Sequence, residues 1–277
     1  KLDPEIRAYL EAENAHTQGA LAVTEPLQRS LFDEMKARLK EDDSTVPSPH
    51  GPFDYYSSYV KGGQYPELRR RPRGSGTERD SVILDGNAEA KGKPYWHLGG
   101  TSHSPDHQLL AYAVDDKGSE LYTIRIRELA TGRDIADEIP DTRGGVVWAN
   151  DGRTFFYVRV DDNHRPLFVY RHTVGTPVAD DVLVHAEADI GFYVGVAQTQ
   201  SSKFILIDVH DHQSNEIYLI DADAPSEPPR MIAERVHGHE YGVEHHDDRL
   251  IIMTNCGGAT DFRICAAPVS APGMGNW

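Results

Sequence analysis

The segment richest in potential metal ligands is HGHEYGVEHHDD, at residues 237–248. Its imidazole and carboxylate groups could together hold a zinc ion. In an extended strand His237, His239 and His245 share a face, because side chains alternate between the two faces. The last of them lies six residues from the second, too far for one small ion unless a turn folds the strand back. We therefore expect solvated or loop-capping histidines, no metal and no cofactor; a metal-dependent sensor using these residues is the alternative.

Motifs for a catalytic nucleophile are absent from the sequence. It contains no G-x-S-x-G elbow, no H-E-x-x-H pair, no phosphate-binding loop and no dinucleotide fingerprint. GSG at 74–76 and GGTSHS at 99–104 are rich in glycine and serine. We interpret both segments as turns and expect no catalytic residue in this chain.

A second group of polar residues stands at repeated positions, each directly after an apolar run that resembles a strand. These are Asp115, Asp116, Asp161, Asp162 and Asp211. If the runs are equivalent strands of a repeating fold, the carboxylates lie around one rim. There they would attract cationic groups of a peptide or pair with basic residues of a docked domain. The alternative is that aspartate simply suits strand ends and turns.

The apolar runs themselves recur with a period in the forties. LLAYAVD, FFYVRVD, FILIDVHD and LIIMTN end at residues 115, 161, 211 and 255. Each follows a polar turn and precedes another strand-like run, and further strands flank most of them. Four short strands per unit at this period indicate the blades of a β-propeller, whereas a helical solenoid would show spacings of three and four. We therefore predict an all-β, incomplete β-propeller of four-stranded antiparallel blades, approximately at 53–94, 95–140, 145–188, 191–235 and 239–277, the last unfinished.

A short α-helical segment precedes the repeat, in two pieces over residues 3–40. Thr24 is a plausible N-cap, and Pro26 falls in the first turn. Four apolar residues then recur at intervals of four: Leu27, Leu31, Met35 and Leu39. This stripe could be a cofactor surface, but packing against another domain is the simpler interpretation. We expect a helical extension at 1–45 and a partial propeller at 46–277, with a polar, proline-rich linker at 41–52.

Composition excludes some classes of partner. With 39% hydrophobic and 26% charged residues the chain is an ordinary globular protein. Its net charge of −16 argues against nucleic acid and anionic membranes but permits a cationic peptide. The arginines at 69–71 and 73 invite a nucleic-acid interpretation, yet in an acidic chain we expect a solvated strand end. No apolar run approaches the roughly 18 residues of a membrane span.

The two cysteines, Cys256 and Cys265, form neither a disulfide framework nor a metal motif. One bridge between them is an alternative, but we expect free thiols in a reducing compartment. With no signal-peptide pattern, a cytoplasmic location is expected. A periplasmic one stays open, because the N-terminus looks trimmed.

Long ordered segments of the sequence resemble the prolyl oligopeptidase family of serine peptidases, in its oligopeptidase B (protease II) branch. They include VPSPHGPFDYYSSYVKGGQYPELRRRPR (46–73), VILDGN (82–87), SPDHQLLAYAVDDKGSELYTIRIRELATG (104–132), VVWANDGRTFFYVRVDDNHRP (146–166), RHTVGT (171–176) and IDAD (220–223). The resemblance implies a seven-bladed propeller, of which about four to five blades are present, covering an α/β-hydrolase domain with a Ser-His-Asp triad. It also implies that the propeller admits only short peptides and that cleavage follows Arg or Lys.

The sequence departs from this family by lacking the hydrolase domain and the last two or more blades. We therefore expect a non-catalytic, inactive fragment of an oligopeptidase B-like peptidase. Its partners would be its own missing α/β-hydrolase domain, on which the helical extension would pack, and short basic peptides. The alternative is a stand-alone, non-enzymatic propeller that binds a peptide or protein through its acidic rim.

Overall fold

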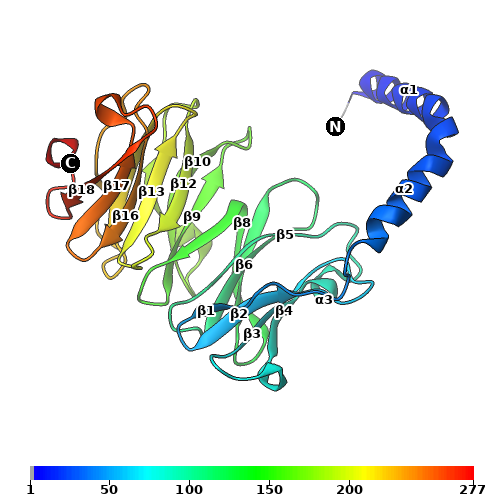
Figure 1. The fold of residues 1–277 in the computed structure, drawn as a ribbon, viewed down its shortest axis with the longest axis horizontal. Coiled ribbons are helices and arrows are strands. Elements are labelled where there is room, and N and C mark those ends of the chain that lie inside the picture. Colours follow the sequence, from blue (N-terminus) through cyan, green and yellow to red (C-terminus); the bar gives the residue numbers. More distant parts are fainter. Residues whose placement is uncertain (1–2) are drawn as a thin grey trace. The chain divides into compact units, whose positions relative to one another are not determined.

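The computed structural model describes residues 3–277, and the chain divides into two compact units, residues 1–87 and 88–277. Residues 1 and 2, the start of the predicted extension, lie outside the described part. The first unit holds two helices and one sheet, and the second holds the remaining sheets (Figure 1). Among the described helices none has the length and apolar character needed to cross a membrane.

The N-terminal helices are α1 (Pro4–Leu21) and α2 (Glu25–Ala37), joined by a single 3₁₀ turn. Asp3 caps α1, since its carboxylate accepts the Glu5 N–H at 2.8 Å. Thr24 occupies the N-cap position of α2 as predicted, but its hydroxyl donates to the Leu21 carbonyl and makes no capping bond. The helix ends at Ala37, so the last residue of the predicted stripe lies beyond it.

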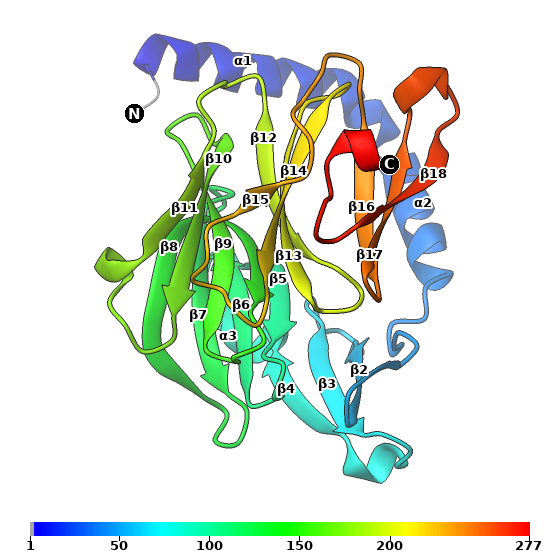
Figure 2. The same ribbon diagram turned by 90° about the vertical axis from the view of Figure 1, so that its left-hand side faces the viewer.

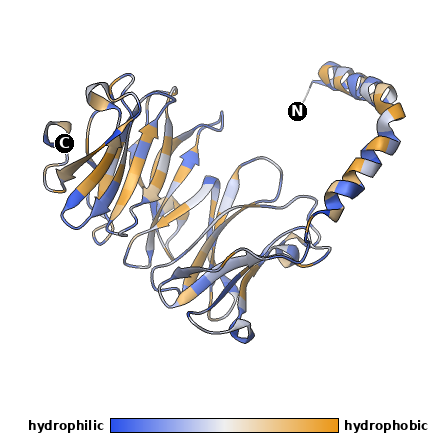
Figure 3. Cartoon of the chain, viewed as in Figure 1, coloured by the Kyte–Doolittle hydropathy of each residue, from blue (hydrophilic) through white to orange (hydrophobic). Residues whose placement is uncertain are grey.

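Neither helix buries a residue within the described structure. Apolar bands are visible along both of them (Figure 3). On α2, Leu27 and Met35 are each 60% exposed, and Leu31 is 46% exposed. Exposed apolar stripes of this kind usually mark an interaction surface.

The sheet of the first unit is blade 1, an antiparallel meander of β1 (Ser48–His50), β2 (Phe53–Ser58), β3 (Glu67–Pro72) and β4 (Ser81–Asp85). The interpretation of 41–52 as a linker was wrong in part, because β1 lies within it. The arginines at 69–71 are not a solvated strand end either. They lie half-buried in the interior strand β3, where Arg71 contacts Asp54 and Asp80 and Arg70 lies over the Phe53 ring.

The second unit contains α3 (Gly86–Ala90) at its N-terminal margin and blades 2 to 5. Blade 2 has β5 (His97–His103), β6 (Leu109–Asp115), β7 (Tyr122–Glu128) and the first part of β8 (Arg133–Trp148). Blade 3 has the rest of β8, β9 (Thr154–Val160), β10 (Pro166–Thr173) and β11 (Val182–Ala186). Blade 4 has β12 (Tyr193–Gln198), β13 (Phe204–His210), β14 (Asn215–Asp221) and β15 (Arg230–Met231). Blade 5 has three strands, β16 (Tyr241–His246), β17 (Arg249–Thr254) and β18 (Arg263–Pro268). The β-propeller prediction is confirmed.

Strand β8 joins two blades into one seven-stranded sheet. The predicted blades at 95–140 and 145–188 implied a loop between them, whereas β8 runs through this boundary as one strand. The single strand pairs with β7 up to Thr142 and with β9 from Thr142 onward. Asp141 and Gly144 have positive φ angles of 59° and 94° at the point where the pairing partner changes. A local bend at two residues therefore replaces the loop that was expected.

The segment GGTSHS, predicted to be a turn, is strand β5 on the inner edge of blade 2. Other parts of the chain approach Gly99 and Gly100 so closely that neither position has room for a side chain. A β-carbon on Gly99 would lie 2.4 Å from the Tyr122 ring, and one on Gly100 would lie 2.5 Å from the carbonyl oxygen of Gly144. Glycine is required here because other chain segments fill the space of a side chain.

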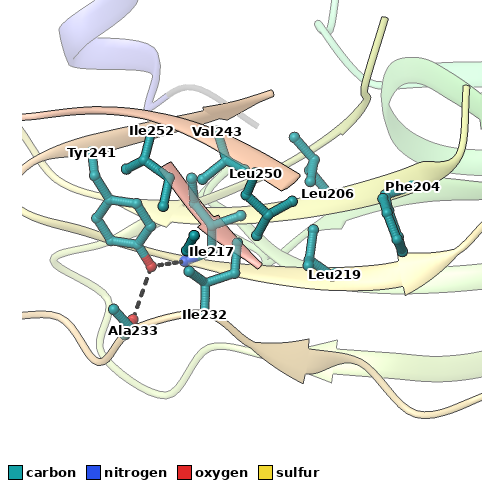
Figure 4. Close-up of a cluster of buried hydrophobic side chains, with 11 residues drawn as sticks. Phe204, Leu206, Ile217, Leu219, Ile232, Ala233, Tyr241, Val243, Leu250 and Ile252 are labelled. Atoms are coloured by element: carbon teal, nitrogen blue, oxygen red, sulfur yellow. Dashed lines mark hydrogen bonds between the residues drawn. The ribbon is translucent and has the colours of Figure 1, made fainter. Parts of the chain in front are cut away.

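Hydrophobic side chains from neighbouring blades of this unit pack against one another in three clusters, one at each junction. The sheets stand side by side in Figure 2. In the cluster between blades 4 and 5, the Tyr241 hydroxyl donates to the Ala233 carbonyl and accepts the Ile217 N–H (Figure 4). Each large apolar side chain buried in this way stabilises the fold by about 1.5–3 kcal/mol.

Gly100→Ala should destabilise the protein by about 1–3 kcal/mol, because the added methyl group meets the Gly144 carbonyl. That loss corresponds to a fall in Tm of about 2–10 °C in thermal unfolding. The matched control is Gly195→Ala on β12, the equivalent strand of blade 4, where a β-carbon has no neighbour within 4 Å. Equal Tm values for the two variants would contradict the close-approach explanation.

Candidate functional site

The predicted site residues lie in three loops, each following the second strand of a blade; we call these the acidic loops. They follow β6 in blade 2, β9 in blade 3 and β13 in blade 4. Asp115 is the last residue of β6, and Asp161 and Asp211 come directly after β9 and β13. The repeat therefore places the three aspartates at equivalent strand ends.

Asp115 is buried, and its carboxylate binds the backbone of its own loop. Oδ1 accepts the N–H groups of Lys117 and Gly118 at 2.8 and 3.0 Å, and Oδ2 accepts that of Glu120 at 2.8 Å. Burial by itself would raise the pKa of Asp115, but these backbone donors outweigh it and lower the pKa overall. The carboxylate is ionised to hold the turn between β6 and β7.

Asp161 and Asp211 hold their loops in the same way. Asp161 accepts the N–H groups of Asn163 and Arg165, and the bond from Arg165 is the main reason its pKa is lowered. Asp211 accepts two backbone N–H groups at 2.7 Å, and this lowers its pKa too. For these three residues, the preference of aspartate for strand ends accounts for the pattern.

The remaining two candidates, Asp116 and Asp162, follow the capping aspartates. Asp162 is exposed and Asp116 is half-buried. Neither carboxylate closes the turn of its loop. A role for them in attracting substrate stays a prediction.

Two arginines near the acidic loops make long-range contacts that the sequence did not reveal. Arg165 lies over the Tyr193 ring at 4.4 Å and donates to its hydroxyl. Arg235 contacts Glu187 at 2.8 Å and packs over Phe192. Each pair joins residues at least 28 positions apart in the chain, so no local motif could have indicated it. These contacts tie blade 3 to blade 4.

The histidine-rich segment is dispersed among separate partners. His239 is buried, its Nε2 lies 3.0 Å from the Thr254 hydroxyl, and burial lowers its pKa. His245 instead contacts the Ser201 hydroxyl at 2.9 Å. Over residues 3–277 no group of three potential ligands is placed to hold a metal ion.

Both cysteines are free, so the alternative disulfide is not formed. Cys256 accepts a hydrogen bond from the Arg263 guanidinium at 3.3 Å. An open groove of about 750 Å³ lies between blades 4 and 5 at the opposite strand ends. Its Lys203 is paired with Asp221 and Asp223, and its Arg230 donates to the Val269 carbonyl.

Asp115→Asn should destabilise the protein by roughly 1–3 kcal/mol, because the amide nitrogen cannot accept the Glu120 N–H. Asp116→Asn, the matched control, should change stability by less than about 0.5 kcal/mol. A group with a lowered pKa stabilises the fold above the ordinary value of about 3.9, and this contribution disappears as the pH falls through the folded-state pKa. In urea unfolding the difference between wild type and Asp115→Asn should therefore shrink in acid. Equal effects of the two substitutions at neutral pH would refute the capping role.

Comparison with known proteins identifies the family. The model described as "Prolyl oligopeptidase, N-terminal beta-propeller domain" matches residues 1–277. The chain is 38% identical to dipeptidyl aminopeptidase BI of Pseudoxanthomonas mexicana over 99% of its own length and 33% identical to protease 2 of Moraxella lacunata over 96%. It spans about 40% of the length of each of these relatives. Oligopeptidase B from Leishmania major has a TM-score of 0.93 at 28% identity, over 98% of this chain and 39% of that chain. The chain therefore belongs to the prolyl oligopeptidase family, and it corresponds to that family's N-terminal β-propeller domain.

Proposed function

We propose that this chain is the non-catalytic propeller of an oligopeptidase B-like serine peptidase. The whole enzyme would hydrolyse short peptides on the carboxyl side of Arg or Lys. Its Ser-His-Asp triad would lie in an α/β-hydrolase domain outside these 277 residues, and the propeller would restrict access by size. The proposed preference for basic substrates rests on Asp116 and Asp162. Their carboxylates remain available on equivalent loops.

The topology of the blades supports placing the acidic loops toward the catalytic domain. In every described blade the chain enters beside the end of the second strand: His97 pairs with Asp115 in blade 2, and Tyr193 pairs with His210 in blade 4. In blade 1, Ser44 likewise forms a bridge with Ser58, the last residue of β2. The helical segment thus joins its blade at the strand end that corresponds to the acidic loops. By repeat position, this is the strand end to which we assign the hydrolase domain.

The exposed stripe of α2 supports such a partner. Leu27, Leu31 and Met35 expose apolar surface that nothing within the first unit covers. Burying such side chains is favourable by about 25 cal/mol per Å². We assign this surface to the hydrolase domain of the same polypeptide.

Chemistry and selection are then divided between the two parts of the enzyme. In the hydrolase domain, the serine would attack the scissile carbonyl with histidine as base, and backbone N–H groups would hold the oxyanion. The propeller contributes no reacting group. Its acidic loops would raise the local concentration of cationic peptides, an effect that salt screens over about 8–10 Å.

In the whole enzyme, the double variant Asp116→Asn/Asp162→Asn should raise KM for Arg-containing peptides about two- to fivefold and leave kcat unchanged, because exposed charges contribute about 0.2–1 kcal/mol each. The increase should diminish at high salt. Asp180→Asn/Asp248→Asn is the matched control, since both residues are exposed and belong to loops at the opposite strand ends. Unchanged KM and salt dependence in the first variant would exclude the attraction of substrate.

The coding sequence beyond Trp277 provides a separate test. We expect it to encode G-x-S-x-G, followed by the aspartate and the histidine of the triad. A stop codon soon after Trp277 would instead support the stand-alone binding propeller and contradict the proposal.

A second activity is favoured by the 38% identity to dipeptidyl aminopeptidase BI. Such an enzyme would remove dipeptides from a free N-terminus. Acetylating the N-terminus of an Arg-containing peptide separates the two activities. An endopeptidase should cleave both forms at similar rates, whereas a dipeptidyl aminopeptidase should cleave only the free form.

A further inference from the structure

Blades 2 and 3 each contain a cluster in which one basic side chain bridges two carboxylates, partly exposed in blade 2 and buried in blade 3. In blade 2, Arg127 donates to Asp134 at 2.8 Å and to Glu89 at 2.9 Å, and the Tyr112 hydroxyl donates to Asp134 at 2.6 Å. We call this arrangement the ionic clamp. It joins β7 to the start of β8 and to helix α3.

The corresponding cluster in blade 3 is built around His172. Its Nδ1 lies 2.6 Å from an Asp181 oxygen, and its Nε2 lies 3.1 Å from an Asp137 oxygen. The Tyr157 hydroxyl donates to Asp181 at 2.6 Å. Asp137 belongs to the part of β8 that forms the outer edge of blade 2, so this clamp ties two blades together.

The two clamps occupy the same positions of the repeat. Tyr112 and Tyr157 are each the fourth residue of the second strand. Arg127 and His172 each pair with the second residue of that strand, Leu110 in one case and Phe155 in the other. In blade 4 the corresponding positions are Ile207 and Ile220, and that blade has apolar contacts instead. His172 therefore stands where blade 2 has an arginine.

The geometry indicates the charge of the imidazole. His172 is fully buried, and both of its ring nitrogens lie within hydrogen-bond distance of a carboxylate. A neutral imidazole has one N–H and could donate to only one of them. We propose that His172 is held as an imidazolium, so that the clamp between blades 2 and 3 is a pH-sensitive counterpart of the permanent one formed by Arg127.

Loss of the proton would leave a buried carboxylate facing a ring nitrogen that cannot donate. The groups around the ring come from every neighbouring element: Asp137 from β8, Asp181 from the turn before β11, and Phe155 and Tyr157 from β9. If Nε2 loses the proton, Asp137 keeps only the Gly175 N–H, and if Nδ1 loses it, Asp181 keeps only the Tyr157 hydroxyl. The Arg159 guanidinium lies 5.7 Å from the centre of the Tyr157 ring. Nothing there replaces the lost donor.

The sign of the pH effect follows from the proton count. The folded chain would retain on His172 a proton that an unfolded chain releases at about pH 6.5. The contribution of the clamp to the free energy of unfolding is then fully present in mild acid and is lost as the pH rises. The connection between blades 2 and 3 should loosen on the alkaline side.

The protonation state can be measured directly on the wild-type chain. In ¹⁵N NMR with labelled histidine, the His172 resonance, assigned by its loss in His172→Gln or by sequential connectivity, should show both ring nitrogens protonated at neutral pH. A neutral tautomer at that pH would overturn the proposal, whatever the variants do.

Thermal unfolding across pH 6–9 tests the consequence. His172→Gln should lower Tm at pH 6 by roughly 5–10 °C and should remove part of the decline of Tm toward alkaline pH seen in the wild type. Arg127→Gln, the matched control in blade 2, should lower Tm at every pH and keep the wild-type decline. If His172→Gln shows the same decline as the wild type, the clamp is not the pH-sensitive element.

Discussion

Face-to-face burial of side chains between neighbouring blades is the constraint on which the larger unit depends. Middle strands such as β9 and β13 send alternate side chains into the clusters on either side of their sheet. A blade of this kind is apolar on both faces, so it is stable only between two others. The recurrence of the apolar runs follows from this need, because every blade must present the same surfaces to its neighbours.

The same constraint determines where polar groups can act. Once the second strands are aligned by packing, the loops that follow them come to equivalent ends. Asp115, Asp161 and Asp211 then use their charge on their own backbone, since a loop that closes a buried strand leaves N–H groups without strand partners. Only acidic residues that do not cap a loop, such as Asp162, remain available to a ligand. Under the proposed function, structural capping and substrate attraction are divided between adjacent aspartates.

Polar contacts between the blades show how the repeat has diverged. At equivalent positions blade 2 has Arg127, blade 3 has His172 and blade 4 has Ile220. Burying charges contributes little net stability compared with apolar packing, while removing one partner of a buried pair is costly. The ionic clamps therefore specify which segments meet, whereas the isoleucines of blade 4 contribute through burial.

The sequence by itself determined the repeating unit and the strand β6 to its last residue, because short apolar runs that recur between polar turns have few other folded solutions, and its long ordered motifs indicated the family by resemblance. Only the tertiary structure decided that GGTSHS is a strand and that β8 is continuous. Glycine has low strand propensity, and the reason for Gly100 is a carbonyl oxygen 44 residues away. No local pattern indicated that His172 bridges Asp137 and Asp181, because these residues lie 35 and 9 positions from it along the chain. The local pattern of apolar and polar residues indicates which side chains a segment must bury. Long-range contacts depend on which surfaces meet after the chain has folded.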